Sequence, residues 1–133
     1  MNKHIYKRLV TFIVFFFLTF SVFAQIPDDL ILCLKSGNDK ILAGYFNQNI
    51  ELVVPGHDDV FSKSQAQQLV AKFFKETNPV SFSILHQGTS GNDGARYAIG
   101  KLGTAKGNYR VYFLLKTSNN KAYIHQLRIE KQA

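Results

Sequence analysis

The chain has 133 residues, a formal net charge of +7 and a single cysteine. One cysteine cannot form an internal disulfide, and no segment has the glycine spacing of a phosphate-binding loop, the Cys and His spacing of a zinc site or the turn of a nucleophile elbow. We therefore expect neither a cofactor nor a metal, and the sequence does not support a nucleotide-binding or zinc-dependent class.

The first 24 residues have the pattern of a secretory signal peptide. A basic start precedes an apolar run over residues 9–20, and Ala24 closes a cleavage-like VFA sequence. The run from Leu9 to Ala24 is shorter than the roughly 18 residues that a spanning helix needs, although an uncleaved anchor is the alternative. A lipoprotein would need a cysteine directly after the cut, but Cys33 lies further along. We expect export to a periplasm or out of the cell, and a product that does not span a membrane.

Cleavage after residues 1–24 leaves residues 25–133 as a single domain that can build its own hydrophobic core. This part carries 13 Lys and Arg against 9 Asp and Glu, a net charge of +4. The charge is uneven, because residues 94–133 hold eight basic side chains and one acidic one. We expect no nucleic acid partner for an exported protein, so an acidic protein or a phosphate-bearing envelope component is the more plausible anion.

The first part of this domain has helical patterns. Pro27 is a good first helical residue and a Ser-Gly pair is a stop, which predicts a helix over 27–35. Asn38 can cap a second helix over 38–46. Cys33 lies in an apolar run of the first helix, so we favour a buried small side chain over a reactive thiol.

A short strand over 50–54 and a Pro-Gly turn lead to the trio His57, Asp58 and Asp59. A metal site normally needs three or four converging ligands, whereas adjacent turn residues point in different directions. We therefore favour a polar turn at the rim of a pocket over a catalytic or metal role. A long helix over 62–78 follows, because a capping-box spacing precedes apolar residues at helical intervals.

From residue 80 onward the hydrophobic period changes to two, which predicts antiparallel strands near 80–87, 95–102, 109–117 and 122–131. Because side chains alternate between the faces of a strand, parity assigns one apolar face. Side chains with an apolar body and a polar tip on that face suit a small-molecule pocket, although buried core residues are the alternative. The candidate pocket residues are Phe82, His86, Tyr97, Tyr109, Phe113, Tyr123 and His125.

Parity gives the opposite face of these strands a basic patch with an aromatic centre. Such a patch fits an anionic partner, and a solvated face or a dimer interface is the alternative. Its members are Arg96, Arg110, Tyr112, Lys116 and Arg128.

The order of elements resembles the nuclear transport factor 2-like superfamily, which has a cystatin-like cone fold. The resemblance rests on two helices separated by LKSGND, a strand ending in Pro-Gly, DVFSK leading into the helix SQAQQLVAKFFKE, and a final four-stranded sheet. The chain is most similar to small exported bacterial proteins of a family of unknown function. The resemblance implies an α+β fold with N-terminal helices packed on the concave face of a curved antiparallel sheet, a pocket between them, and homodimers through the other face.

Isomerase-like members of that superfamily place a general-base Asp and a Tyr donor at positions that correspond here to Val54 and Leu30. Neither side chain can transfer a proton or donate a hydrogen bond to an oxyanion. The hypothesis that we favour is therefore an exported non-catalytic domain that binds a small amphipathic ligand in the cone or a partner on the sheet. The alternative is an exported hydrolase or isomerase that uses His125 or His86 with help from Asp58 or Asp59.

Overall fold

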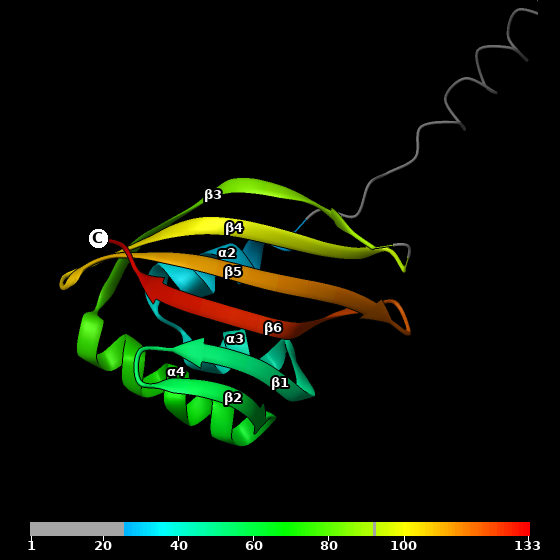
Figure 1. Cartoon of the computed structure of the whole chain (residues 1–133), viewed down its shortest axis with the longest axis horizontal. Helices are drawn as coiled ribbons and strands as arrows, with labels where there is room; N and C mark the ends of the chain where they lie inside the picture. Colours follow the sequence, from blue (N-terminus) through cyan, green and yellow to red (C-terminus); the bar gives the residue numbers. More distant parts are fainter. Residues whose placement is uncertain (1–25, 92) are drawn as a thin grey trace, which may run out of the picture.

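The computed structural model describes residues 26–91 and 93–133, so the predicted signal peptide lies outside the described residues. Three helices precede or interrupt a six-stranded sheet of order β2-β1-β6-β5-β4-β3 (Figure 1). None of the helices in these two ranges is long and apolar enough to cross a membrane. The elements are α2 (Asp28–Ser36), α3 (Asp39–Gly44), β1 (Phe46–Val54), β2 (His57–Ser62), α4 (Lys63–Thr77), β3 (Pro79–Ser90), β4 (Ala95–Thr104), β5 (Gly107–Ser118) and β6 (Lys121–Lys131).

The three helices begin at the predicted caps. Pro27 precedes α2, and Gly37 ends that helix with a left-handed φ of 67°. The Asn38 side chain accepts a hydrogen bond from the backbone of α3. Ser62 and Gln65 form a complete capping box on α4. Side-chain capping therefore fixes where α3 and α4 start, and Pro27 precedes α2 without a side-chain cap.

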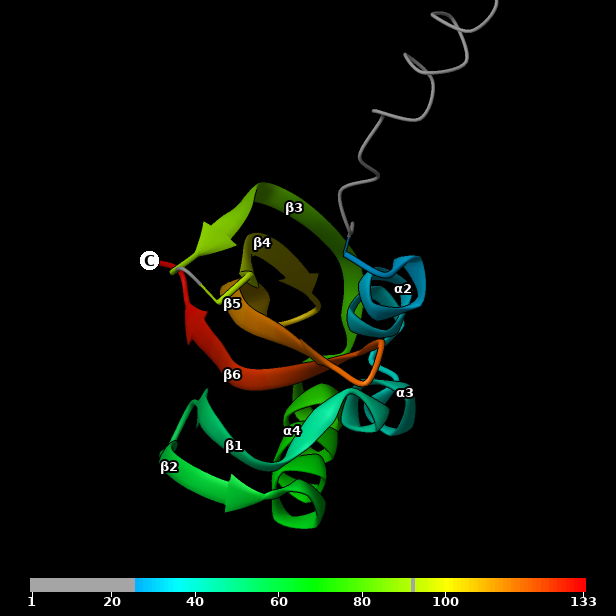
Figure 2. The ribbon, with the colours of Figure 1, turned by 90° about the vertical axis from the view of Figure 1, so that its right-hand side faces the viewer.

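The helices cover one face of the curved sheet, which we call the inner face, and leave the opposite outer face uncovered (Figure 2). The predicted α+β architecture with a curved sheet is confirmed. The last four strands are antiparallel neighbours, as predicted. β1 instead pairs in parallel with β6, so the sheet is mixed, and β2 completes an antiparallel hairpin with β1 at the edge.

The inner face is the hydrophobic core. Side chains of β4, β5 and β6 lie there in paired rows, such as Ala98 beside Phe113 and Phe113 beside Leu127. All three of these side chains are fully or almost fully buried. Gly100 leaves the space that the Phe82 ring occupies, because a Cβ at residue 100 would collide with that ring. The core therefore fills the region where the sequence predicted a ligand pocket.

The predicted face is wrong for Tyr97 in β4. Tyr97 pairs with Leu114 on the outer face, whereas the small neighbours Ala98 and Gly100 face the core. Parity placed the bulkier side chains inside, but large residues from the adjacent strands already fill the core and require small partners in β4. By the same register Arg96, which was predicted on the outer face, pairs with buried Leu115 on the inner face.

Two register irregularities change the predicted positions of three further residues. In β3 the pairing shifts between Ile84 and His86, so that His86 lies on the outer face. In β6 the pairing shifts at His125, because Leu114 pairs with Gln126 and Leu115 pairs with Ile124. Tyr123 is therefore opposite Lys116 on the outer face, and His125 is half-buried at the bulge. An extra residue in one strand inverts the parity of everything beyond it.

Candidate functional site

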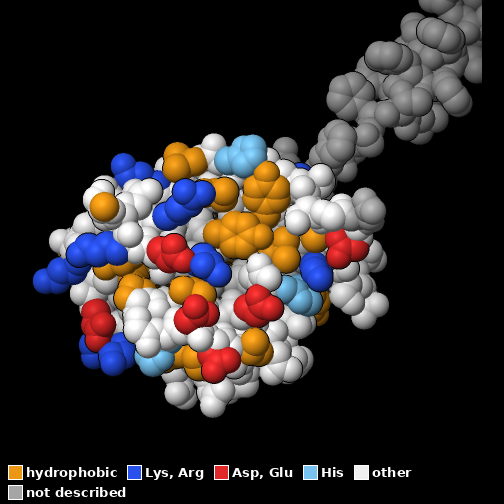
Figure 3. Space-filling model, in the orientation of Figure 1, with side chains coloured by type: hydrophobic (Ala, Val, Ile, Leu, Met, Phe, Trp, Pro, Cys, Tyr) orange, Lys and Arg blue, Asp and Glu red, His pale blue; other side chains and the backbone are white. Residues whose placement is uncertain are grey.

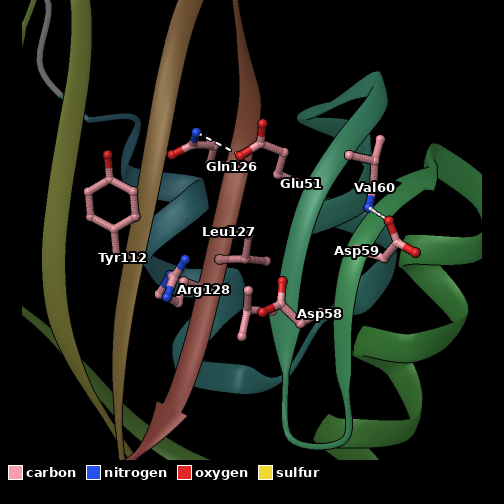
Figure 4. Close-up of a pocket in the computed structure, with 9 residues that line it drawn as sticks. Glu51, Asp58, Asp59, Val60, Tyr112, Gln126, Leu127 and Arg128 are labelled. Atoms are coloured by element: carbon pink, nitrogen blue, oxygen red, sulfur yellow. Dashed lines mark hydrogen bonds between the residues drawn. The ribbon is translucent and has the colours of Figure 1, made fainter.

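The trio His57, Asp58 and Asp59 lies on the edge strand β2. The turn before it consists of Pro55 and Gly56, and Gly56 has a positive φ of 88°. The three side chains of the trio alternate across the strand rather than converge. The His57 ring packs edge-on against the Phe61 ring, with 6.3 Å between the ring centroids. The Asp58 side chain points toward β6 (Figure 4). The trio is therefore not a single site, although its carboxylates border one.

The outer face is hollowed between the β1–β2 hairpin and strands β5 and β6 (Figure 4). The hollow has a volume of about 270 Å³. Register explains why it collects residues from four strands, since Asp58, Val53 and Arg128 lie in one row across three neighbouring strands. Tyr112 continues the row on β5. The lining residues are Glu51, Val53, Asp58, Asp59, Val60, Tyr112, Gln126, Leu127 and Arg128.

The carboxylates of the hollow differ in how they are engaged. Glu51 accepts a hydrogen bond of 2.8 Å from the Gln126 amide. Asp59 accepts one of 2.7 Å from the backbone N–H of Val60. Within residues 26–91 and 93–133, no hydrogen bond or ion pair engages the exposed Asp58 carboxylate. Asp58 is thus the acceptor that the hollow offers to a binding partner.

The opposite wall of the hollow begins an aromatic strip across β5, β4 and β3. The Tyr112 and Tyr97 rings stack with 6.4 Å between their centroids and an interplanar angle of 25°. The Tyr97 hydroxyl and the His86 Nε2 atom form a hydrogen bond of 2.7 Å. Orange side chains flanked by charged ones are visible at the centre of this face (Figure 3). We call His86, Tyr97 and Tyr112 the outer aromatic strip.

The predicted basic patch is dispersed on the outer face. Arg128 donates to Glu130 at 3.0 Å, and Lys116 lies 3.8 Å from the Asp93 carboxylate. Both pairs are exposed and therefore contribute little to stability. With Arg96 on the other face, these residues do not form the continuous basic surface that parity suggested.

The hydrolase or isomerase alternative requires a His and an Asp within hydrogen-bond reach. His86 and Asp58 lie on the two opposite edge strands, five strand spacings apart, or about 24 Å measured along the sheet. His125 lies two strands from β2 and three residues along β6 from Arg128, which shares a row with Asp58. Burial and, to a smaller extent, the Lys116 charge lower the pKa of His125. The described residues bring neither pair together, and no three His, Cys, Asp or Glu side chains among them could hold a metal ion.

The candidate residues on the inner face are core residues. Phe113 is completely buried, and Phe82 and Tyr109 are nearly so. The Tyr109 ring packs edge-on against Phe73 at 4.9 Å. Leu30 and Val54, the positions of the isomerase donor and base, are also buried in this core. A ligand could contact Phe113 only after the core had opened.

Sequence reasoning missed Glu51, Val53, Val60, Gln126 and Leu127 as residues of the hollow. The alternation in IELVV does place Glu51 and Val53 on one face of a strand. What the sequence does not indicate is that β1 joins β6 in parallel, which brings Glu51 opposite Gln126. A parallel pairing between distant segments has no local signal.

Solved structures of similar sequence share this architecture over nearly their whole length. A domain-of-unknown-function DUF4783 protein from Bacteroides ovatus is 33% identical, with a TM-score of 0.75, and the alignment covers 81% of this chain and 96% of that one. A DUF4783 protein from Bacteroides uniformis is also 33% identical, with a TM-score of 0.74 and coverage of 82% and 99%. Among proteins with curated functions, none matches this chain.

More distant structures show the fold alone. A domain of unknown function with a cystatin-like fold from Nostoc punctiforme is 8% identical, with a TM-score of 0.61 and coverage of 78% of this chain and 71% of that one. The nuclear transport factor 2-like, cystatin-like fold expected from the sequence is thereby confirmed. The family model for the domain of unknown function DUF4783 matches residues 27–130, and the chain therefore belongs to the DUF4783 family.

Proposed function

We propose that the chain is an exported, non-catalytic binding domain that holds a protein partner on its outer sheet face. The observation that carries this proposal is the contrast between the two faces of the sheet. Buried side chains fill the centre of the inner face, whereas the outer face presents the outer aromatic strip beside a charged hollow. Surface aromatic side chains next to a concavity are typical of sites where a partner inserts an anchoring side chain.

The hollow favours a cationic side chain, Lys or Arg, of that partner. The Glu51 and Asp58 carboxylates lie on the side of the hollow, whereas the Asp59 carboxylate points away from β6 and accepts from its own strand (Figure 4). The one guanidinium of the lining, that of Arg128, already pairs with Glu130. A cation beside Asp58 would gain an ion pair with this carboxylate, and Tyr112 lies further along the same row, beyond Arg128. The net charge of the domain is positive, so the preference for a cation comes from the carboxylates of the hollow and not from the charge of the whole domain.

A non-catalytic role is supported by the positions of the candidate catalytic groups. The His and Asp side chains lie on separated strands, and apolar residues occupy both isomerase positions. A general base must come within about 3 Å of the proton that it abstracts, with another group to orient it. The residues of the outer face can bind and orient a partner, but their geometry supplies no such pair.

The proposal is tested by photo-crosslinking in the exporting cell. A photoreactive residue replaces Val60, which lines the hollow and is 57% exposed, or Leu32 on α2, which is 60% exposed and serves as the matched control. We expect a protein adduct from residue 60 that is absent from residue 32. The adduct should disappear in the Asp58→Lys variant and persist in the Asp28→Lys variant, which makes the same charge change elsewhere.

Equal adducts from both positions, or an adduct that survives Asp58→Lys, would contradict a partner at the hollow. An adduct of two copies of the chain would assign the outer face to a homodimer instead. The same recovered protein tests export, because its N-terminal sequence should begin at Gln25. A chain recovered with residues 1–24 attached would contradict cleavage.

A further inference from the structure

A second concavity opens on the inner side of the sheet, between α2 and the strands β3 and β4. Its volume is about 260 Å³. Three isoleucines, Ile26, Ile31 and Ile84, provide apolar walls, and Asp28, Gln87 and Arg96 provide the polar groups. It is separate from the outer hollow, because Arg96 pairs with buried Leu115 on the inner face.

Arg96 is the unusual member of this concavity. Its Nε atom is buried and has no hydrogen-bond partner among residues 26–91 and 93–133. A buried donor of a charged group is costly to leave unpaired, and a carboxylate that pairs with the accessible part of the guanidinium would offset part of that cost. A guanidinium presents several N–H donors in a planar fork that matches the two oxygens of a carboxylate.

The register of β3 explains how the apolar wall and the polar groups come together. The irregularity between Ile84 and His86 leaves Ile84 opposite Gly100 and Gln87 opposite Ala98, both on the inner face. The isoleucine and the amide thus lie on the same side of β3, next to Arg96 on β4. The concavity therefore combines one fixed positive charge with aliphatic walls.

We propose that this concavity binds a small amphipathic anion, with its carboxylate on Arg96 and its alkyl chain against Ile26, Ile31 and Ile84. The volume indicates how much of a ligand the concavity can cover. At about 30 Å³ for each water-sized group, the concavity holds about nine non-hydrogen atoms, which corresponds to a carboxylate of six to seven carbon atoms. Asp28 lies at the rim and is exposed, so it weakens an anion's binding without closing the site.

The test is an NMR titration of the chain as recovered after export, with sodium hexanoate as the probe. We expect saturable shifts at the amides of Ile31, Ile84 and Arg96. Arg96→Met should weaken binding about 10- to 100-fold, the range for losing a charge-assisted pair. Arg110→Met, which removes the same charge from the outer face, should leave it unchanged. Asp28→Asn should strengthen it a few-fold.

A neutral probe and a second variant at residue 96 test the role of the charge and of the fork. The neutral 1-hexanol should bind more weakly than hexanoate, and Arg96→Lys, which keeps the charge but not the fork, should bind hexanoate between the native chain and Arg96→Met. The proposal is overturned if hexanoate gives no saturable shift, or if a folded Arg96→Met or Arg96→Lys variant binds it as the native chain does. Tighter binding of norleucine than of hexanoate would also overturn it, in favour of a dipolar ligand. Crosslinking from residue 60 does not depend on these outcomes.

Discussion

Gly100 on β4 gives the sharpest prediction about packing in this fold. A Cβ added at this residue would collide with the Phe82 ring and would lie 2.8 Å from the Ser83 carbonyl oxygen. Phe82 is 8% exposed, so its ring cannot simply swing into solvent, and the carbonyl belongs to a paired strand. Gly→Ala in a strand usually stabilises by roughly 0.5–1 kcal/mol, but here the overlap should reverse the sign.

We expect Gly100→Ala to lower the free energy of unfolding by about 1–3 kcal/mol, the usual cost of overpacking a core. For a domain of this size, each 1 kcal/mol lowers Tm by about 4–8 °C. The matched control is Gly44→Ala in α3, where an added Cβ meets nothing within 4 Å. That control should be neutral or stabilise by up to about 1 kcal/mol, because alanine is the better helix former.

Thermal and urea unfolding of the two variants provide the measurement. Part of the cost should be recovered when Gly100→Ala is combined with Phe82→Leu, because the smaller side chain releases the collision. If Gly100→Ala proves as stable as Gly44→Ala, or if Phe82→Leu gives no recovery, the packing described for the inner face is wrong.

Three further predictions follow from single side chains. Burial raises the pKa of the Cys33 thiol to about 12, so a thiol reagent at pH 8 should label it only after unfolding, and fast labelling of the folded chain would contradict its burial. The pKa of His125 should lie below 6.5 by NMR and rise only partly in Lys116→Ala, since burial is the larger cause. The neutral ring is favoured in the folded state, so this contribution to stability is lost as the pH falls below 6.5. Ser62→Ala should cost about 1 kcal/mol in urea unfolding through loss of the α4 cap, and an unchanged midpoint would contradict the capping box.

The sequence predicts the parts of this fold that depend on neighbouring residues. Ser62 and Gln65 identify the start of α4, and Asn38 identifies the start of α3, because capping is decided within one turn. Breaks rich in glycine or asparagine identify the hairpins of the last four strands, and resemblance to a superfamily supplies the curved sheet. The caps and the hairpin breaks are local signals, whereas the resemblance rests on the order of elements along the whole chain.

The faces of the strands depend on pairing and were less predictable. The irregularities beside His86 and at His125 add a residue to one strand without marking the sequence, and each inverts the inferred face. In β4 the inner positions belong to Ala98 and Gly100 because Phe113 and Phe82 already fill the space. Arg96 therefore lies in the inner concavity and not in the predicted basic patch. The location of the candidate sites therefore required the three-dimensional register.

The hollow depends on a contact that local reasoning could not provide. Glu51 and Gln126 are 75 residues apart in the chain and are brought together by the parallel pairing of β1 with β6. Asp58 was noticed in the sequence for its neighbours His57 and Asp59, yet its relevant neighbours are Val53 and Arg128 across the sheet. Asp58 does belong to a candidate site, but it does not form that site together with His57 and Asp59.

Whether a partner covers the outer face in the exporting cell can be measured with two introduced thiols. Val60→Cys and Leu32→Cys introduce thiols at similarly exposed positions, while the native Cys33 is buried. Labelling rates with a maleimide are compared between intact cells and the purified chain. Residue 60 should be labelled more slowly in cells than after purification, and Asp58→Lys should remove this protection. Residue 32 should be labelled at the same rate in cells and after purification. Equal labelling of the two positions in cells and in the purified chain would contradict a partner on the outer face.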